Sequence, residues 1–236
     1  HQLPIDPTPD TLSYFVTFMS HHIQPRSVDA YLSGIVNQLE PHFPNVRRSR
    51  HSMLVKRTLR GALHSLGRPI ERKQPLLRDD LLRVYSSLQH PLSHDDLLWV
   101  TQLHCGFYGL LRLGELVAPD EAALREFSKF SLRTSVTVSS TDFSFLIQRD
   151  KTDVRYEGNK VVIHHVELGS DPLPLFTRYI LSRDFHFPLH PFLWLRSNGR
   201  PPSRSWFIRQ FRRFFSGSFS GHSMRAGGAT SLASAG

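Results

Sequence analysis

Residues 108–116 read YGLLRLGEL and residues 221–230 read GHSMRAGGAT, and these two stretches decide the fold. In the first stretch, Arg112 and Glu115 lie three residues apart in a leucine-rich helical pattern, so on a helix they share one face. In the second, His222 and Arg225 have the same spacing at the start of a predicted helix. Each pair taken alone is also common on the surface of an ordinary amphipathic helix, so their interpretation depends on the rest of the chain.

Between these stretches the hydrophobic period changes from that of a helix to that of a strand. Phe143, Phe145 and Ile147 alternate with polar or smaller residues, and Val161 and Ile163 do so more loosely. The intervening segment, 150–159, reads DKTDVRYEGN and ends on Gly-Asn, which suits a turn. We therefore predict a small antiparallel sheet among helices, with Lys151 near the tip of a hairpin. A lysine at such a position is usually no more than an exposed charge.

The remainder of the chain has mainly helical periodicity. Thr8-Pro9-Asp10 is a helix start signal, and residues 28–39 and 52–66 repeat an amphipathic pattern. Segment 67–77, GRPIERKQPLL, is basic and holds two prolines, which is typical of an extended linker. Later helices are predicted over 79–88, 93–117, 173–181, 203–215 and 221–236. We place a helical domain at residues 1–74 and a second domain at 75–236.

Composition limits the classes of function. The 236 residues carry 29 Lys and Arg against 20 Asp and Glu, a net charge of +9. Residues 1–75 hold ten of the basic residues and five of the acidic ones. This balance suits a polyanionic partner. One cysteine, Cys105, forms no internal disulfide and excludes a zinc site built from several thiolates. There is neither a run of about 18 apolar residues nor a signal peptide at the start. We expect an intracellular protein, nuclear in a eukaryote.

Basic residues gather in two further places. One is the helical pattern of the first domain, with Lys56, Arg57 and Arg60. The other is the stretch 203–215, where aromatic residues alternate with Arg204, Arg209, Arg212 and Arg213. There the aromatic residues would be buried and the arginines exposed. Such a surface suits contacts with phosphate groups, and it is equally typical of a plain solvated face.

Together these features resemble the tyrosine recombinases of the phage-integrase type. GLLRLGEL is similar to the first arginine motif of that family, KTD (151–153) to its hairpin lysine motif, and GHSMRAGGAT to its His-x-x-Arg box. The stretch LWLRSNGRPPSRSWF (193–207) is similar to integrase-like proteins of fungal mobile elements. The resemblance implies a mainly α fold with a small antiparallel sheet. A helical core-binding domain would precede a mixed α/β catalytic domain that lacks its C-terminal end.

The resemblance also implies roles for individual residues. Arg112 and Arg225 would clamp the scissile phosphate with help from His222, and Glu115 would hold Arg112 in place. Lys151 would protonate the departing 5′-oxygen. The basic residues of 56–60 and 203–215 would contact double-stranded DNA, on which copies of the chain could associate. No metal or other cofactor is implied, because the arginines supply the positive charge. The 14 histidines show no metal-ligand spacing.

One feature departs from the family pattern. The nucleophilic tyrosine of the family follows the His-x-x-Arg box, whereas all six tyrosines of this chain precede it. The chain starts on His1 and ends eleven residues after Arg225, so we interpret it as a fragment that binds DNA but does not cleave it alone. One alternative is a DNA-binding remnant of a mobile-element integrase without enzymatic activity. Another is a helical protein-interaction module, in which RRSR (47–50) and KRTLR (56–60) are a nuclear localisation signal or a solvated face.

Overall fold

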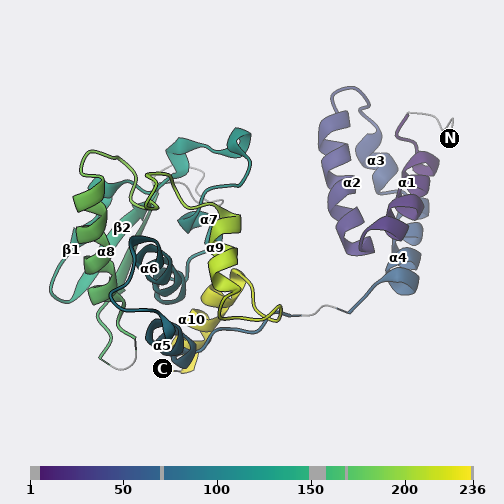
Figure 1. Cartoon of the computed structure of the whole chain (residues 1–236). Helices are drawn as coiled ribbons and strands as arrows, with labels where there is room; N and C mark the ends of the chain where they lie inside the picture. The colour runs from purple at the N-terminus through teal and green to yellow at the C-terminus, as the bar shows by residue number, and fades with distance from the viewer. Residues whose placement is uncertain (1–5, 70–71, 149–157, 168–169, 235–236) are drawn as a thin grey trace. The chain divides into compact units, whose positions relative to one another are not determined.

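The computed structural model describes residues 6–69, 72–148, 158–167 and 170–234, and the chain divides into two compact units (Figure 1). The units are His1–Glu71 and Arg72–Gly236. This division falls three residues before the boundary predicted from the sequence. The reason is that Lys73 Nζ donates to Gly217 O at 2.9 Å and Gln74 N donates to Ser218 O at 2.9 Å. Both residues are thereby bonded into the second unit.

The first unit consists of helices around a small apolar core. Its helices are α1 (Pro9–His22), α2 (Pro25–Leu39), α3 (Val46–Arg50) and α4 (Met53–Leu66). Pro9 and Pro25 occupy first-turn positions, where a missing N–H costs nothing. Thr8 Oγ1 accepts from Thr11 N, and Ser52 Oγ accepts from Val55 N, so side chains cap α1 and α4. The core consists of Leu12, Val16, Val28, Leu32 and Val55.

The second unit is mainly helical with one small sheet. Its helices are α5 (Arg78–Ser87), α6 (His94–Tyr108), α7 (Leu113–Leu116), α8 (Pro172–His186), α9 (Arg204–Phe211) and α10 (His222–Ser234). Short 3₁₀ turns cover Ala122–Leu124, Phe127–Lys129 and Arg133–Ser135. None of the helices in the described part of the chain combines the length and apolar character that crossing a bilayer requires.

The sheet is antiparallel, in the order β1 (Thr137–Val138), β2 (Asp142–Ile147) and β3 (Asn159–His164). Phe143 pairs with Ile163, so the alternating apolar residues of both strands meet on one face. That face packs against α8, where the rings of Phe143 and Phe176 stack with centroids 3.9 Å apart. The predicted antiparallel pairing of the strands on either side of 150–159 is confirmed. The two exposed residues of β1 carry no alternating pattern that would reveal a strand.

Helix α6 is the central element of the second unit, and α8 and α10 pack against it (Figure 1). Every residue from Leu97 to Phe107 is buried. The prediction of one helix over 93–117 is wrong, because α6 ends at Tyr108. Leu110 then adopts a left-handed conformation with φ of 53°, and Leu111 N donates back to Gly106 O at 3.1 Å. The chain consequently turns just before Arg112.

Candidate functional site

The turn after α6 determines how Arg112 is presented. Arg112 is not inside a helix, as the sequence suggested, but is the extended N-cap residue of α7, with φ −76° and ψ 143°. Glu115 Oε2 accepts from Arg112 N at 2.8 Å, and Glu115 Oε1 accepts from Arg112 Nη1 at 3.0 Å. The Glu115 side chain is 13% exposed and that of Arg112 is 42% exposed. One largely buried carboxylate therefore orients both the backbone and the guanidinium of Arg112.

Helix α10 carries the second motif and lies unusually close to its neighbours. A Cβ added at Gly228 would lie 2.0 Å from Phe107 O, and one added at Gly227 would lie 2.1 Å from Leu76 O. A Cβ at Gly106, on α6, would lie 2.7 Å from Met224 Sδ. Side chains at Gly227 and Gly228 would collide with the segment around Leu76 and with α6, and one at Gly106 would collide with α10. The small residues of GHSMRAGGAT thus permit backbone-to-backbone packing.

This packing brings the two motifs together, although they are far apart in the sequence. A Cβ at Gly221 would lie 2.7 Å from Leu113 Cδ2, so the start of α10 abuts α7. His222 is exposed and Arg225 is half-buried. Among the described residues, neither side chain has a hydrogen bond or an ion pair within the protein. The start of α10 therefore offers two polar side chains that protein contacts do not occupy.

Lys151 lies outside the described residues. The strands on either side of it are in place, with β2 ending at Ile147 and β3 beginning at Asn159.

The arginines of residues 203–215 divide into two groups. The aromatic residues of this stretch are largely buried, as their spacing predicts, but α9 is shorter than expected and ends at Phe211. Arg212 Nη1 donates to Phe219 O at 3.1 Å and also to Ser216 O, and Arg213 Nη1 donates to Asp96 Oδ1 at 2.9 Å. These two arginines support the fold. Arg204 and Arg209 are exposed on α9.

The start of α9 is tied to the chain that leaves α7. Ala118 N donates to Pro202 O at 2.8 Å, and Arg204 N donates to Ala118 O at 3.0 Å. Two backbone hydrogen bonds therefore connect Ala118, just after α7, with Pro202 and with Arg204, the first residue of α9. Arg204 consequently stands on an element that is bonded to the Arg112 motif.

In the first unit, the basic residues also separate into paired and unpaired groups. Arg47 forms an ion pair with Glu40, and Arg50 forms one with Asp29 at 3.0 Å. Lys56, Arg57 and Arg60 are exposed on α4, and within the described ranges their side chains have no ion-pair or hydrogen-bond partner. Helix α4 therefore displays uncompensated positive charge.

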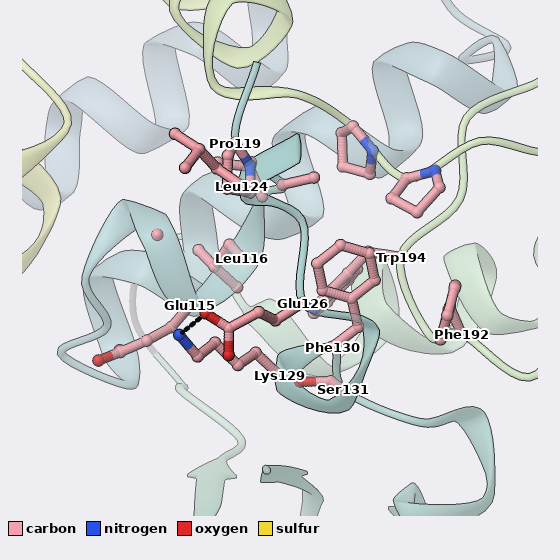
Figure 2. Close-up of a pocket in the computed structure, with 15 residues that line it drawn as sticks. Glu115, Leu116, Pro119, Leu124, Glu126, Lys129, Phe130, Ser131, Phe192 and Trp194 are labelled. Atoms are coloured by element: carbon pink, nitrogen blue, oxygen red, sulfur yellow. Dashed lines mark hydrogen bonds and ion pairs between the residues drawn. The ribbon is translucent and has the colours of Figure 1, made fainter. Parts of the chain in front are cut away.

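An apolar pocket of about 120 Å³ adjoins Glu115 (Figure 2). It is lined by Leu116, Leu124, Phe130 and Trp194, among others, and Lys129 at its edge is paired with Glu126 at 2.6 Å. Such a lining does not suit a phosphate group. The candidate phosphate site is consequently the exposed face beside Arg112 and the start of α10. In the described segments, no three or more His, Cys, Asp or Glu side chains are placed to hold a metal ion.

Two tyrosines of the second unit are engaged in structural hydrogen bonds. Tyr179 is fully buried and donates to Leu193 O at 2.9 Å, and Tyr108 donates to Ser170 O at 3.2 Å. Burial raises the pKa of both phenols above its ordinary value, which disfavours the phenolate. Both hydroxyls are thus poorly suited to nucleophilic attack.

Similarity to known proteins is found at the level of structure. No protein-family model matches the sequence, and no curated protein matches it. The structure of XerH site-specific recombinase bound to palindromic difH substrate, a post-cleavage complex, is 13% identical with a TM-score of 0.58. That match covers 95% of this chain and 61% of XerH.

Two further structures are similar. A pre-cleavage complex of XerH with difH is 12% identical, with a TM-score of 0.48 and coverage of 90% of this chain and 60% of that one. A lambda integrase (75–356) dimer bound to a COC′ core site is 15% identical, with a TM-score of 0.45 and coverage of 88% and 70%. The chain thus spans about three fifths of XerH. The post-cleavage XerH structure confirms the fold expected from the resemblance, that of the tyrosine recombinases.

Proposed function

We propose that this chain is the DNA-binding part of a tyrosine recombinase, which grips duplex DNA and holds one backbone phosphate at Arg112, His222 and Arg225. The proposal depends on one observation. Glycines allow α10 and the residue before it to pack closely against α6 and α7, so the two arginine motifs lie on adjoining segments. The fold shared with XerH, a site-specific recombinase bound to its difH substrate, is consistent with this proposal.

The chemistry of the site suits a phosphodiester. Strand cleavage builds negative charge on the non-bridging oxygens, and planar guanidinium groups donate paired hydrogen bonds to such oxygens. Glu115 already orients Arg112, so binding of the phosphate costs little side-chain entropy there. Arg225 and His222 would complete the set of donors from the start of α10.

The grip on the rest of the duplex would come from exposed cations of both units. In the first unit we assign it to Lys56, Arg57 and Arg60, which have no acidic partner in the described part of the chain. In the second unit we assign it to Arg204 and Arg209. Arg212 and Arg213 fit this role less well, because their guanidinium groups already bond to protein oxygens.

Binding is the activity that we assign to these 236 residues, and cleavage is not. Cleavage would also need Lys151 as the general acid and an attacking tyrosine. None of the six tyrosines matches the position of the nucleophile in the family.

The test is a salt series of DNA binding. Each phosphate contact contributes about 0.9 to the slope of log affinity against log salt. Replacing Lys56, Arg57 and Arg60 together by Ala should therefore reduce the slope by about 2.7. Arg225→Ala should weaken binding roughly 10- to 100-fold, the loss typical of charge-assisted hydrogen bonds. The control is Arg178→Ala on the exposed side of α8, which we expect to leave affinity unchanged. Binding that is absent, or that does not respond to salt, refutes the proposal.

A further inference from the structure

The first segment of the second unit, residues 73–78, follows the loop that leads to α10 and then follows α10 itself. Lys73 Nζ donates to Gly217 O at 2.9 Å, Gln74 N donates to Ser218 O at 2.9 Å, and Leu76 N donates to Ser223 O at 3.0 Å. The first two bonds join the incoming chain to the loop before His222, and the third joins it to the first turn of α10. We call residues 73–78 the linker segment.

The linker segment stays in contact with α10 over further turns. Gly227 lies so close to it that an added Cβ would be 2.1 Å from Leu76 O, and Arg78 Nε donates to Ser231 Oγ at 2.7 Å. Positions 223, 227 and 231 are four residues apart and form one stripe along the helix. The linker segment therefore holds α10 along a single side.

A second side of α10 is held by α6. Met224 is buried against Gly106, and Gly228 packs on the backbone of Phe107. With these two sides fixed, both the rotation of α10 about its axis and its position along the axis are set. His222 and Arg225 project from the parts of the helix that neither neighbour covers.

The loop before α10 has its own internal brace. Arg212 Nη1 donates to Ser216 O and to Phe219 O, the latter at 3.1 Å. The backbone between them, at Gly217 and Ser218, is the part that bonds to the linker segment. A displacement of the linker segment would consequently be passed to the first turn of α10.

We propose that the linker segment is a positioning element that sets where His222 and Arg225 stand, and that it couples the DNA grip of the first unit to the phosphate site. One residue, Arg72, separates Lys73 from the end of the first unit, so tension or order that DNA imposes on the first unit would be transmitted to this segment along the backbone. Lys73 is then a positioning residue that acts through the loop, and it does not itself touch the phosphate. The inference rests on the proposed function.

The first experiment measures amide hydrogen exchange in the complete chain without DNA. Gln74→Pro removes the N–H that bonds to Ser218 O, and the matched control Gln74→Ala retains it. The rate of amide exchange at residues 216–226 should rise roughly fivefold or more in the Pro variant. The reason is that the closed state loses one backbone hydrogen bond, so the locally open state from which exchange occurs becomes more populated by about this factor. Equal exchange in the Pro and Ala variants overturns the inference.

The second experiment uses the neighbouring cations Arg72 and Lys73, which carry equal charge but differ in their contacts. Of the two, both of which the structure describes, Lys73 alone has a hydrogen bond to the loop before α10. Affinities for duplex DNA are measured for Lys73→Met, Arg72→Met and Arg225→Ala, and for each Met variant combined with Arg225→Ala.

A positioning role predicts that Lys73→Met and Arg225→Ala are non-additive by at least about threefold, because the first change already misplaces Arg225. The effects of Arg72→Met and Arg225→Ala on DNA affinity should be additive. Lys73→Arg, which keeps a donor at this position, should leave the effect of Arg225→Ala as large as in the wild-type chain. Additive effects for Lys73 overturn the inference while leaving DNA binding intact. If the wild-type chain does not bind DNA, the proposed function fails, and the exchange experiment without DNA still decides whether the linker segment positions α10.

Discussion

Gly228 offers a sharp test of how α10 is seated, because replacing it with Ala adds a single carbon atom at the tightest contact of the helix. The new Cβ would lie 2.0 Å from Phe107 O, 2.7 Å from Leu110 Cδ2 and 3.0 Å from Phe107 C. The side chain of Leu110 can rotate away, but the backbone of Phe107 belongs to the buried α6 and cannot. Helix α10 must then move away from α6, or the contact must be strained.

The size of the effect follows from two opposing terms. In an open helix, Gly→Ala stabilises by about 0.5–1 kcal/mol, because Gly loses more backbone entropy on folding. Overpacking of a close contact costs about 1–3 kcal/mol and sometimes more. We expect the steric cost to exceed the entropic gain, so that Gly228→Ala lowers the free energy of unfolding of the second unit by about 1–2 kcal/mol. At Gly114, on α7, an added Cβ would have no heavy atom within 4 Å, and Gly114→Ala should stabilise slightly.

The assay is urea unfolding followed by tryptophan fluorescence. All three tryptophans, Trp99, Trp194 and Trp206, are buried in the second unit, so the signal reports on that unit without interference from the first. The midpoint should fall for Gly228→Ala and stay level or rise for Gly114→Ala. A Gly228→Ala variant that is as stable as the wild-type chain would refute the close seating of α10 and, with it, the geometry of the phosphate site.

Two further predictions concern buried polar groups. Burial lowers the pKa of His104 to about 4, against about 6.5 for a free imidazole. Between these two pH values the unfolded chain therefore binds more protons than the folded chain. About 3 kcal/mol of stability that is present above pH 6.5 should consequently be lost as the pH falls to 4. His104→Gln should flatten the dependence of the free energy of unfolding on pH in this range. Arg183, which is 0% exposed, donates to Phe192 O at 2.8 Å and to Phe187 O at 3.0 Å. Arg183→Met should cost about 2–4 kcal/mol in the same urea assay, because two buried carbonyls lose their donor, whereas a variant with little change would show that these carbonyls find other partners.

Much of the architecture could be predicted from local patterns. The apolar spacing of the first unit and its capping residues identify α1, α2 and α4, because a helix that buries one face must repeat its apolar residues every three to four positions. The change to alternation at Phe143 identifies β2 in the same way. The order of the two arginine motifs pointed to the fold that the XerH structure shares.

Other features depend on contacts between distant residues. The leucines of 108–116 continue the pattern of α6, and nothing in their spacing shows that the helix stops at Tyr108. The chain leaves the helix where Leu110 adopts a left-handed conformation, and Gly109 there lies close to the sheet: an added Cβ would be 3.1 Å from Ile163 Cδ1. Likewise, Arg204 and Arg212 look alike in the sequence, and only the folded chain brings Ser216 O and Phe219 O to the guanidinium of Arg212.

The sequence by itself thus predicted most of the helices, the pairing of β2 with β3 and a division into two parts near residue 74, and it proposed the polar residues that could meet a phosphate. Tertiary structure alone decided that α6 ends before Arg112, that glycines let α10 pack closely against α6, and that the linker segment bonds to the loop before His222. The physical reason is the range of the interactions. Periodicity and capping act within a few residues. Close backbone approach, and which donor binds a given carbonyl oxygen, depend on segments that come together only when the chain has folded.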